Sequence, residues 1–249
     1  MTADEPGTLR SEPARRFGLR VTALFAGTLL AASLFGVVLL LVRAKNSVVH
    51  RWDSSVAEHL HRFALDHRSY TRVMQTISDA GAPPAWWAIL FPVTAWLVWR
   101  RRYRLAAFVV VTTVGSSLLN RLIKATVGRA RPHLVDPVSA AGGASFPSGH
   151  AQAALVGWGV LLLVFLPYLP DRWRRPAIAF AAVVVLAIGY SRIALGVHYL
   201  FDVVGAYLVG AVWLVGLTLG FRAWRRELGE PVPEVSEGLE PDGPDRPVH

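Results

Sequence analysis

Three short segments of the 249-residue sequence combine cations, histidines and a carboxylate in patterns that suit the binding of an anion. In the first, Lys124-Ala-Thr-Val-Gly-Arg-Ala-Arg131-Pro132, Lys124 and Arg131 lie about two helical turns apart, so both point to one side if the helix continues. Two cations on one side attract an anion, whereas a lone lysine at the end of a membrane helix often only extends to the interface. The segment predicts an anion-binding pair.

The second segment, Ser145-Phe-Pro-Ser-Gly-His150, directly precedes an apolar run. Ser148 is placed to cap the helix that this run predicts, and the free N–H groups and positive dipole end of a first turn form a natural anion site. Gly149 allows a ligand to approach the backbone closely. Capping alone does not explain His150, an ionisable group at the membrane edge.

The third segment, Ser191-Arg192-Ile-Ala-Leu-Gly-Val-His198-Tyr-Leu-Phe-Asp202, leads into another apolar run. On a helix, His198 and Asp202 are one turn apart, so the carboxylate can accept a hydrogen bond from one imidazole nitrogen and leave the lone pair of the other free. A histidine prepared in this way is a nucleophile or a base. Taken alone, the pair is also consistent with a hydrogen bond that only stabilises a helix end.

Together, the segments supply two histidines, the start of a helix and the cations Lys124, Arg131 and Arg192. Phosphoryl transfer needs fixed cations and backbone donors that hold the charge on the phosphoryl oxygens. The combination therefore predicts phosphoryl-transfer chemistry.

The elements that position these segments are predicted to be membrane helices. Apolar residues make up 53% of the chain and charged residues only 17%, against about 25% charged in soluble domains. A bilayer core about 30 Å thick needs a helix of about 20 mainly apolar residues. Uncharged runs that meet or approach this length occupy residues 21–42, 80–99, 105–120, 151–170, 176–191 and 203–221. The third and fifth runs are short, so we expect neighbouring turns with Lys124 or Arg192 to complete those two crossings.

The six spans predict an all-α, polytopic membrane protein, with the helices in a bundle and both termini on one side. Four arginine groups lie at the span ends of that side: residues 10–20, 100–104, 172–175 and 222–226. The positive-inside rule makes this side cytoplasmic and the active site extracytoplasmic. The net charge of +9 is thus explained by topology, and no basic domain for nucleic acid is expected.

The predicted domain covers residues 17–226, between a disordered cytoplasmic tail at 1–16 and an acidic disordered cytoplasmic tail at 227–249. Between the first two spans, residues 48–78 have helical apolar spacing with interleaved charges, which predicts short amphipathic helices on the outer face. They either shape an entrance for lipid or only cover the bundle. The chain has no cysteine, so a disulfide framework is excluded.

The three segments resemble the motifs of the type 2 phosphatidic acid phosphatase superfamily, in its membrane lipid phosphatase branch. These motifs are Lys-x6-Arg-Pro, Pro-Ser-Gly-His and Ser-Arg-x5-His-x3-Asp, and the sequence meets all three without a departure at residues 124–132, 147–150 and 191–202. Three motifs in the right order are a specific signal. The resemblance implies a six-helix membrane enzyme over residues 17–226.

The resemblance also implies a role for each site residue. His198 would attack phosphorus and form a phosphohistidine, Asp202 would orient it, and His150 would protonate the leaving group. It further implies a metal-independent reaction without a cofactor, in agreement with the lack of a carboxylate cluster suited to magnesium. The residues implied to bind the substrate phosphate are Lys124, Arg131, Ser148, Gly149 and Arg192.

Other functions share these motifs or this layout. Vanadate-dependent haloperoxidases and soluble acid phosphatases carry similar motifs, but the six spans argue against both. Transfer of the phosphoryl group to a lipid or sugar acceptor would use the same first step, and a transporter of anionic lipids would need the cations but no nucleophile.

The partners implied are the bilayer and a lipid phosphate substrate. The residues fit phosphatidic acid, phosphatidylglycerol phosphate and polyprenyl phosphate or diphosphate alike, and the outward-facing site favours a polyprenyl diphosphate. The sequence does not determine the oligomeric state.

Overall fold

The computed structural model describes residues 11–134, 139 and 141–227. Within this part of the chain all regular structure is helical, which confirms the predicted all-α class. The elements are α1 (Ser11–Arg43), α2 (Ser47–Asp66), α3 (Arg68–Ala80), α4 (Pro83–Trp99), α5 (Tyr103–Val127), α6 (Gly149–Phe165), the 3₁₀-helix η1 (Leu166–Tyr168), α7 (Asp171–Ala194) and α8 (Leu200–Glu227).

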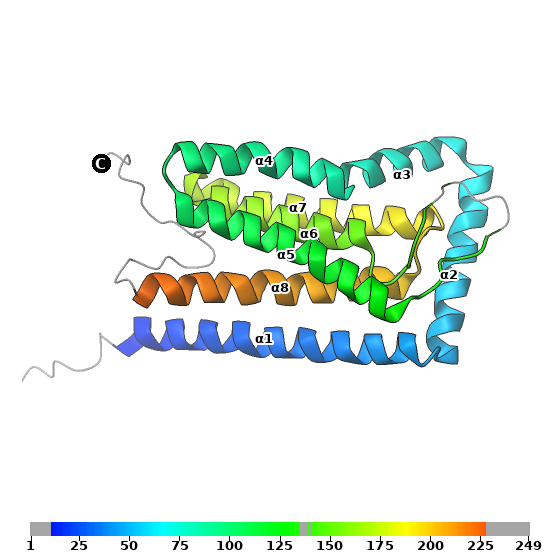
Figure 1. The fold of residues 1–249 in the computed structure, drawn as a ribbon, viewed down its shortest axis with the longest axis horizontal. Coiled ribbons are helices and arrows are strands. Elements are labelled where there is room, and N and C mark those ends of the chain that lie inside the picture. Colours follow the sequence, from blue (N-terminus) through cyan, green and yellow to red (C-terminus); the bar gives the residue numbers. More distant parts are fainter. Residues whose placement is uncertain (1–10, 135–138, 140, 228–249) are drawn as a thin grey trace, which may run out of the picture.

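Figure 1 shows α1 and α4 to α8 side by side along the long axis, as expected of a membrane bundle. The start of α1 and the end of α8 lie at the same end of this bundle. Helix α1 begins at Ser11, within the predicted N-terminal tail, while residues 1–10 and 228–249 of the two predicted tails lie outside the described residues. The tail boundaries stay predictions.

Within the described residues, five helices are long and apolar enough to cross a membrane, so the chain is a multi-pass membrane protein. They are Leu24–Arg43 of α1, Tyr103–Val127, Gly149–Tyr168, Asp171–Ala194 and Leu200–Arg222. The predicted short runs at 105–120 and 176–191 are completed by helical turns that include Lys124 and Arg192, which confirms the expectation.

The sixth predicted span, residues 80–99, is not one straight helix. Helix α4 has only 17 residues, and it is long enough for a span only together with α3, from which it is bent by 42°. Pro83 and Pro84 start α4 because a proline fits the first turn of a helix but interrupts its interior. At the break, a Cβ on Gly81 would lie 2.2 Å from Ile188 of α7, so only glycine permits this close approach.

Short amphipathic helices were expected over residues 48–78, and α2 and α3 occupy this range. Helix α2 crosses one end of the bundle, as Figure 1 shows. Helix α3, in contrast, packs along α7 and leads through a bend into α4, so it is part of the bundle.

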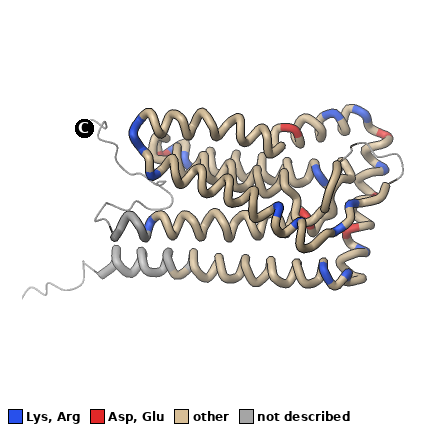
Figure 2. Tube along the Cα trace, in the orientation of Figure 1, with Lys and Arg blue, Asp and Glu red and all other residues tan. Residues whose placement is uncertain are grey.

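Lysine and arginine residues lie at both ends of the bundle (Figure 2). The arginines at 100–104 and 172–175 lie in the α4–α5 turn and at the start of α7, away from α2, as the predicted topology requires. The end crossed by α2 carries its own cations, so the charge difference between the two ends is smaller than the four arginine groups suggest. It is at this second end that the three predicted motifs meet.

Candidate active site

The predicted site residues converge where α5 ends, α6 begins, α7 ends and α8 begins. All four of these helix ends lie at the end of the bundle that α2 crosses (Figure 1). Elements far apart in sequence therefore each contribute one part of the site.

His198 is the centre of this cluster and is 2% exposed. Its Nδ1 lies 3.5 Å from the Oδ2 of Asp202 and 3.4 Å from the Oγ of Ser145. Its Nε2 lies 3.2 Å from Nη1 of Arg131, and because a guanidinium only donates, Nε2 accepts and the ring proton is on Nδ1. Burial lowers the pKa of His198 to about 4, although Asp202 opposes this shift, so the imidazole is neutral at neutral pH.

Asp202 is fully buried and accepts hydrogen bonds at both oxygens. Oδ2 accepts from the hydroxyl of Ser145 and from the backbone N–H of Tyr199, the latter at 2.8 Å. The pair with His198 was expected to lie on one helix, but α8 begins at Leu200, so His198 is in the preceding turn and this expectation is wrong. The Asp202 carboxylate, in the first turn of α8, instead accepts the N–H of Tyr199 just before the helix and faces the imidazole with the same oxygen.

Lys124 and Arg131 were expected to share one face of a continuing helix. The helix ends at Val127, because Gly128 adopts the left-handed conformation (φ 61°) and its N–H bonds to the Lys124 carbonyl. The following loop nevertheless returns Arg131 to the site. Nζ of Lys124 and Nη2 of Arg131 approach the same carbonyl oxygen, that of Ala144, at 2.5 and 3.5 Å.

Helix α6 begins at Gly149, with Ser148 at the N-cap position. The predicted capping bond is absent, since the Ser148 hydroxyl is buried and has no hydrogen-bond partner among the described residues. A Cβ on Gly149 would come within 4 Å of a single side chain, at 3.6 Å from Oδ1 of Asn120, so packing does not require glycine there. Both features leave this helix start free to contact a ligand.

His150 follows in the first turn of α6 and is half-buried. It is close enough to Arg192, His198, Arg131 and Lys124 to interact with them electrostatically. The structure thus brings both predicted histidines and all three predicted cations into one cluster.

Arg192 closes the cluster from the last turn of α7 and is buried. Its Nη1 donates to the hydroxyl of Ser78 on α3, while its Nε has no hydrogen-bond partner among the described residues. Two buried donors, Ser148 Oγ and Arg192 Nε, are therefore unsatisfied where an anion is expected.

Comparison with known proteins finds a family to which part of the chain is similar. Residues 104–226, which contain every predicted site residue, match the family model described as PAP2 superfamily. This segment, about half of the chain, is similar to the PAP2 superfamily.

Relatives of the PAP2 segment are similar over part of their length. The chain is 33% identical to phosphatidylglycerophosphatase B of Bacillus subtilis over 106 residues, 42% of this chain and 51% of that protein. It is 34% identical to lipid A 1-phosphatase of Rhizobium etli over 123 residues, 46% of this chain and 49% of that protein. The chain thus spans about half the length of these two relatives.

Two further likenesses extend beyond the PAP2 segment. An undecaprenyl-diphosphatase of Sulfolobus acidocaldarius is 27% identical over 175 residues, 67% of this chain and 75% of that protein. The crystal structure of a transmembrane PAP2 type phosphatidylglycerolphosphate phosphatase from Bacillus subtilis has a TM-score of 0.69 at 23% identity, covering 80% of this chain and 96% of that chain. The structural likeness supports the predicted fold, a bundle of membrane helices.

The candidate active site also includes five residues to which the motif analysis gave no role: Asp53, Ser78, Arg129, Ser145 and Tyr199. For Asp53 a signal was present, since a carboxylate stands one turn after Val49 and one before Ala57 on the apolar face of an amphipathic helix. Arg129 stood inside the first motif but was not assigned a role. Nothing in the sequence points to Ser78.

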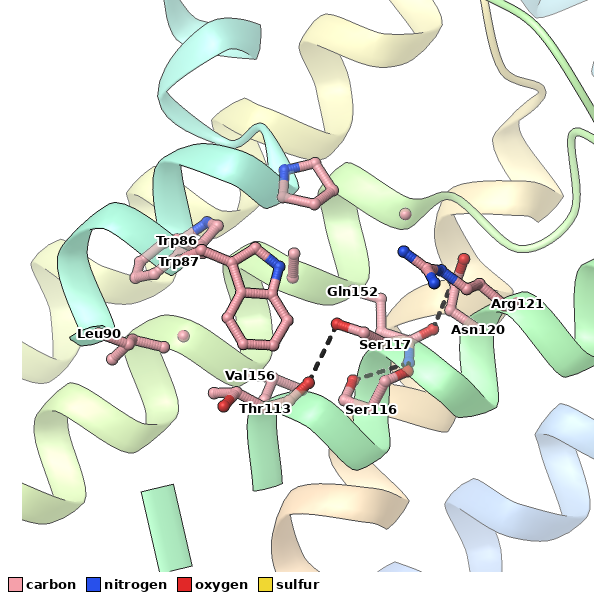
Figure 3. A pocket seen from close by; sticks show the side chains of 14 residues that line it. Trp86, Trp87, Leu90, Thr113, Ser116, Ser117, Asn120, Arg121, Gln152 and Val156 are labelled. Carbon is pink, nitrogen blue, oxygen red and sulfur yellow. Dashed lines mark hydrogen bonds between the residues drawn. The ribbon is translucent and has the colours of Figure 1, made fainter. Parts of the chain in front are cut away.

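A pocket of about 180 Å³ lies between α4, α5 and α6, next to the candidate active site (Figure 3). Gly149 of the second motif lines this pocket, and Trp86, Trp87 and Leu90 form its apolar wall. Its opposite wall holds a buried polar chain, in which Asn120 donates to Gln152 at 2.8 Å and Gln152 donates to the Ser116 hydroxyl at 2.9 Å. The pocket thus has apolar and polar sides.

Proposed function

We propose that this chain is a membrane lipid phosphatase that hydrolyses a phosphomonoester or diphosphate of a lipid through a phosphohistidine at His198. The observation that carries the proposal is the state of His198, whose neutral imidazole turns Nε2 toward Arg131 while Nδ1 faces Asp202. The match of residues 104–226 to the PAP2 family model and the phosphatase names of similar proteins support the same reaction class.

In the first step, Nε2 of His198 attacks phosphorus, a P–N bond forms, and the P–O bond to the lipid alcohol or to the lipid phosphate breaks. His150 donates a proton to the leaving oxygen. Lys124, Arg131 and Arg192 offset the charge on the phosphoryl oxygens, together with the Ser148 hydroxyl and the N–H groups at the start of α6.

In the second step, His150 accepts a proton from water, the resulting hydroxide equivalent attacks phosphorus, and the P–N bond breaks. Inorganic phosphate leaves and His198 is neutral again. Asp202 offsets the positive charge that the imidazole carries while it is phosphorylated, which is the role of a carboxylate beside a reacting histidine.

The substrate class follows from the surroundings of the site. The pocket at Gly149 would receive the part of the lipid next to its phosphate, with Trp86, Trp87 and Leu90 against the hydrocarbon. Polyprenyl diphosphate, phosphatidylglycerol phosphate and phosphatidic acid all present such a group. We favour a polyprenyl diphosphate, with both chain termini in the cytoplasm and the site on the extracytoplasmic face.

The test is phosphate release by the detergent-purified protein from a panel of these lipids in EDTA. We expect wild-type release that persists in EDTA, disappears in His198→Ala and is unchanged in His59→Ala, a matched exposed histidine on α2. An acid-labile phosphoprotein should form when the wild type is mixed with lipid that carries a labelled phosphate, and it should not form with His198→Ala.

Each other result names a different function. Loss of all release in EDTA, with recovery on adding a divalent metal, would overturn the metal-independent mechanism. Release that needs an added alcohol or sugar acceptor would indicate phosphotransfer, and lipid movement across vesicles by His198→Ala would indicate transport.

A further inference from the structure

Helix α2 contributes a buried carboxylate to the site end of the bundle. Asp53 is fully buried, and Val49 and Ala57 flank it on the same helix face. An unpaired carboxylate in such surroundings costs several kcal/mol, so a buried one needs charged or N–H partners. The partners of Asp53 all come from the PAP2 segment.

Two groups satisfy Asp53. Its Oδ2 accepts a hydrogen bond from Nη2 of Arg129 at 2.5 Å, and its Oδ1 accepts one from the backbone N–H of Phe201 at 3.0 Å. Phe201 directly precedes Asp202 in the first turn of α8. Asp53 therefore holds the same helix turn that carries the carboxylate beside His198.

Arg129 connects the two carboxylates. Its Nη1 donates to Oδ1 of Asp202 at 2.7 Å, while its Nη2 donates to Asp53. The guanidinium also stacks over the ring of Tyr199, 4.4 Å from the ring centre. A planar guanidinium with two fixed donors can bridge two acids in one orientation, which a lysine cannot.

The role of Arg129 differs from that of the other cations in the cluster. Its charge is balanced by two carboxylates, and it contacts the oxygen of Asp202 opposite to the one that faces His198. With Arg129 on Oδ1 and with Ser145 and the Tyr199 N–H on Oδ2, rotation of the carboxylate is blocked at both oxygens. Arg129 thus fixes the Oδ1 side of the carboxylate whose other oxygen faces the imidazole.

We propose that Arg129, anchored by Asp53 of α2, is a positioning residue that fixes the Asp202 carboxylate against His198, so that α2 is part of the catalytic unit and not only a cover. This inference rests on the proposed phosphatase function. It predicts a defect in turnover and not in the binding of phosphate.

The experiment compares Asp53→Asn, Arg129→Lys and Arg129→Gln with the wild type on the lipid that it hydrolyses. Glu58→Gln is the matched control, because it removes one acidic charge from an exposed position of the same helix. For each protein, kcat, KM and the inhibition constant of inorganic phosphate are measured, with elution volume and thermal unfolding in detergent as checks on folding.

We expect kcat to fall about ten- to a hundredfold in all three variants, as is usual when the partner that orients a reacting group is lost. KM and the inhibition constant of phosphate should stay within about twofold, because uniform binding is untouched. The double variant Asp53→Asn/Arg129→Gln should turn over no more slowly than Arg129→Gln alone, since both act through one contact. Glu58→Gln should match the wild type.

Asp53→Asn keeps the test valid if an Arg129 variant does not fold, because the asparagine oxygen can still accept the Phe201 N–H. Wild-type kcat in Asp53→Asn or Arg129→Lys, additive losses in the double variant, or phosphate inhibition that weakens in parallel with kcat would each overturn the inference while the phosphatase function stands. A wild type that releases no phosphate from any lipid would overturn both.

Discussion

The Nε2 of His198 lies 3.2 Å from Nη1 of Arg131. This contact holds the imidazole with its lone pair toward the cation that is expected to bind the phosphate. The same guanidinium donates to the carbonyl oxygens of Val197 and Gly142, at 2.7 and 2.9 Å, so Arg131 also ties the loop after α5 to the turn before α8. The predicted nucleophile and a predicted phosphate ligand are therefore fixed relative to each other before substrate binds.

The pH dependence of activity follows from the buried state of His198. Its pKa, lowered to about 4, keeps the imidazole neutral and nucleophilic at any pH above that value. We expect kcat/KM to rise as the pH increases through about 4, and to fall again at higher pH where the leaving group no longer finds a proton, which gives a bell-shaped profile.

The profile should be measured with two lipid substrates whose phosphate groups have different pKa values. A monoester phosphate loses its second proton near pH 6. A change in activity caused by the substrate therefore occurs at a different pH for each lipid, whereas the change caused by His198 occurs at the same pH for both. An acid limb near pH 6.5 that is the same for both substrates would show an imidazole with the pKa of an exposed histidine, against the expectation.

Arg192→Ala should reduce kcat/KM about a hundredfold, or about 3 kcal/mol, by analogy with the removal of one oxyanion donor. The cause is the loss of a buried cation whose Nε has no hydrogen-bond partner among the described residues. Steady-state phosphate release is the measurement, with Arg72→Ala as the control for an exposed arginine on α3. Nearly full turnover in Arg192→Ala would remove this residue from the phosphate site.

Ser148→Ala should raise KM without lowering stability. A serine that caps a helix contributes about 1 kcal/mol, but the Ser148 hydroxyl makes no capping bond and is available for phosphate. Thermal unfolding in detergent and KM are measured side by side, with Ser55→Ala on the surface of α2 as the control. A lower unfolding temperature at unchanged KM would restore the capping role.

The orientation of the chain can be tested with single cysteines, because the sequence contains none. Glu58→Cys on α2 marks the site end, and Tyr103→Cys, at a side chain that is 61% exposed, marks the opposite end. In intact cells a membrane-impermeant maleimide should label Glu58→Cys at once, and Tyr103→Cys only after the membrane is permeabilised. The reverse order would place the site in the cytoplasm.

Local sequence determined most of the membrane helices and the part of the site that the three motifs contain. Long uncharged runs can exist in a bilayer only as helices, because every backbone N–H and C=O must be satisfied within the segment. The three motifs named eight residues, and the structure gathers them at one end of the bundle although they range from Lys124 to Asp202. A short motif reports chemistry directly, because residue types and their spacing already restrict what a segment can bind.

Tertiary structure alone decided how the residues are connected. The return of Arg131 to His198 after the end of α5 and the close approach of Gly81 to Ile188 at the bend between α3 and α4 depend on contacts with distant segments. The same holds for the bridge from Asp53 to Asp202 through Arg129, which joins a surface helix to the start of α8. The spacing of residues along the chain does not predict such contacts, because they form only when the helices pack together and their buried charges pair.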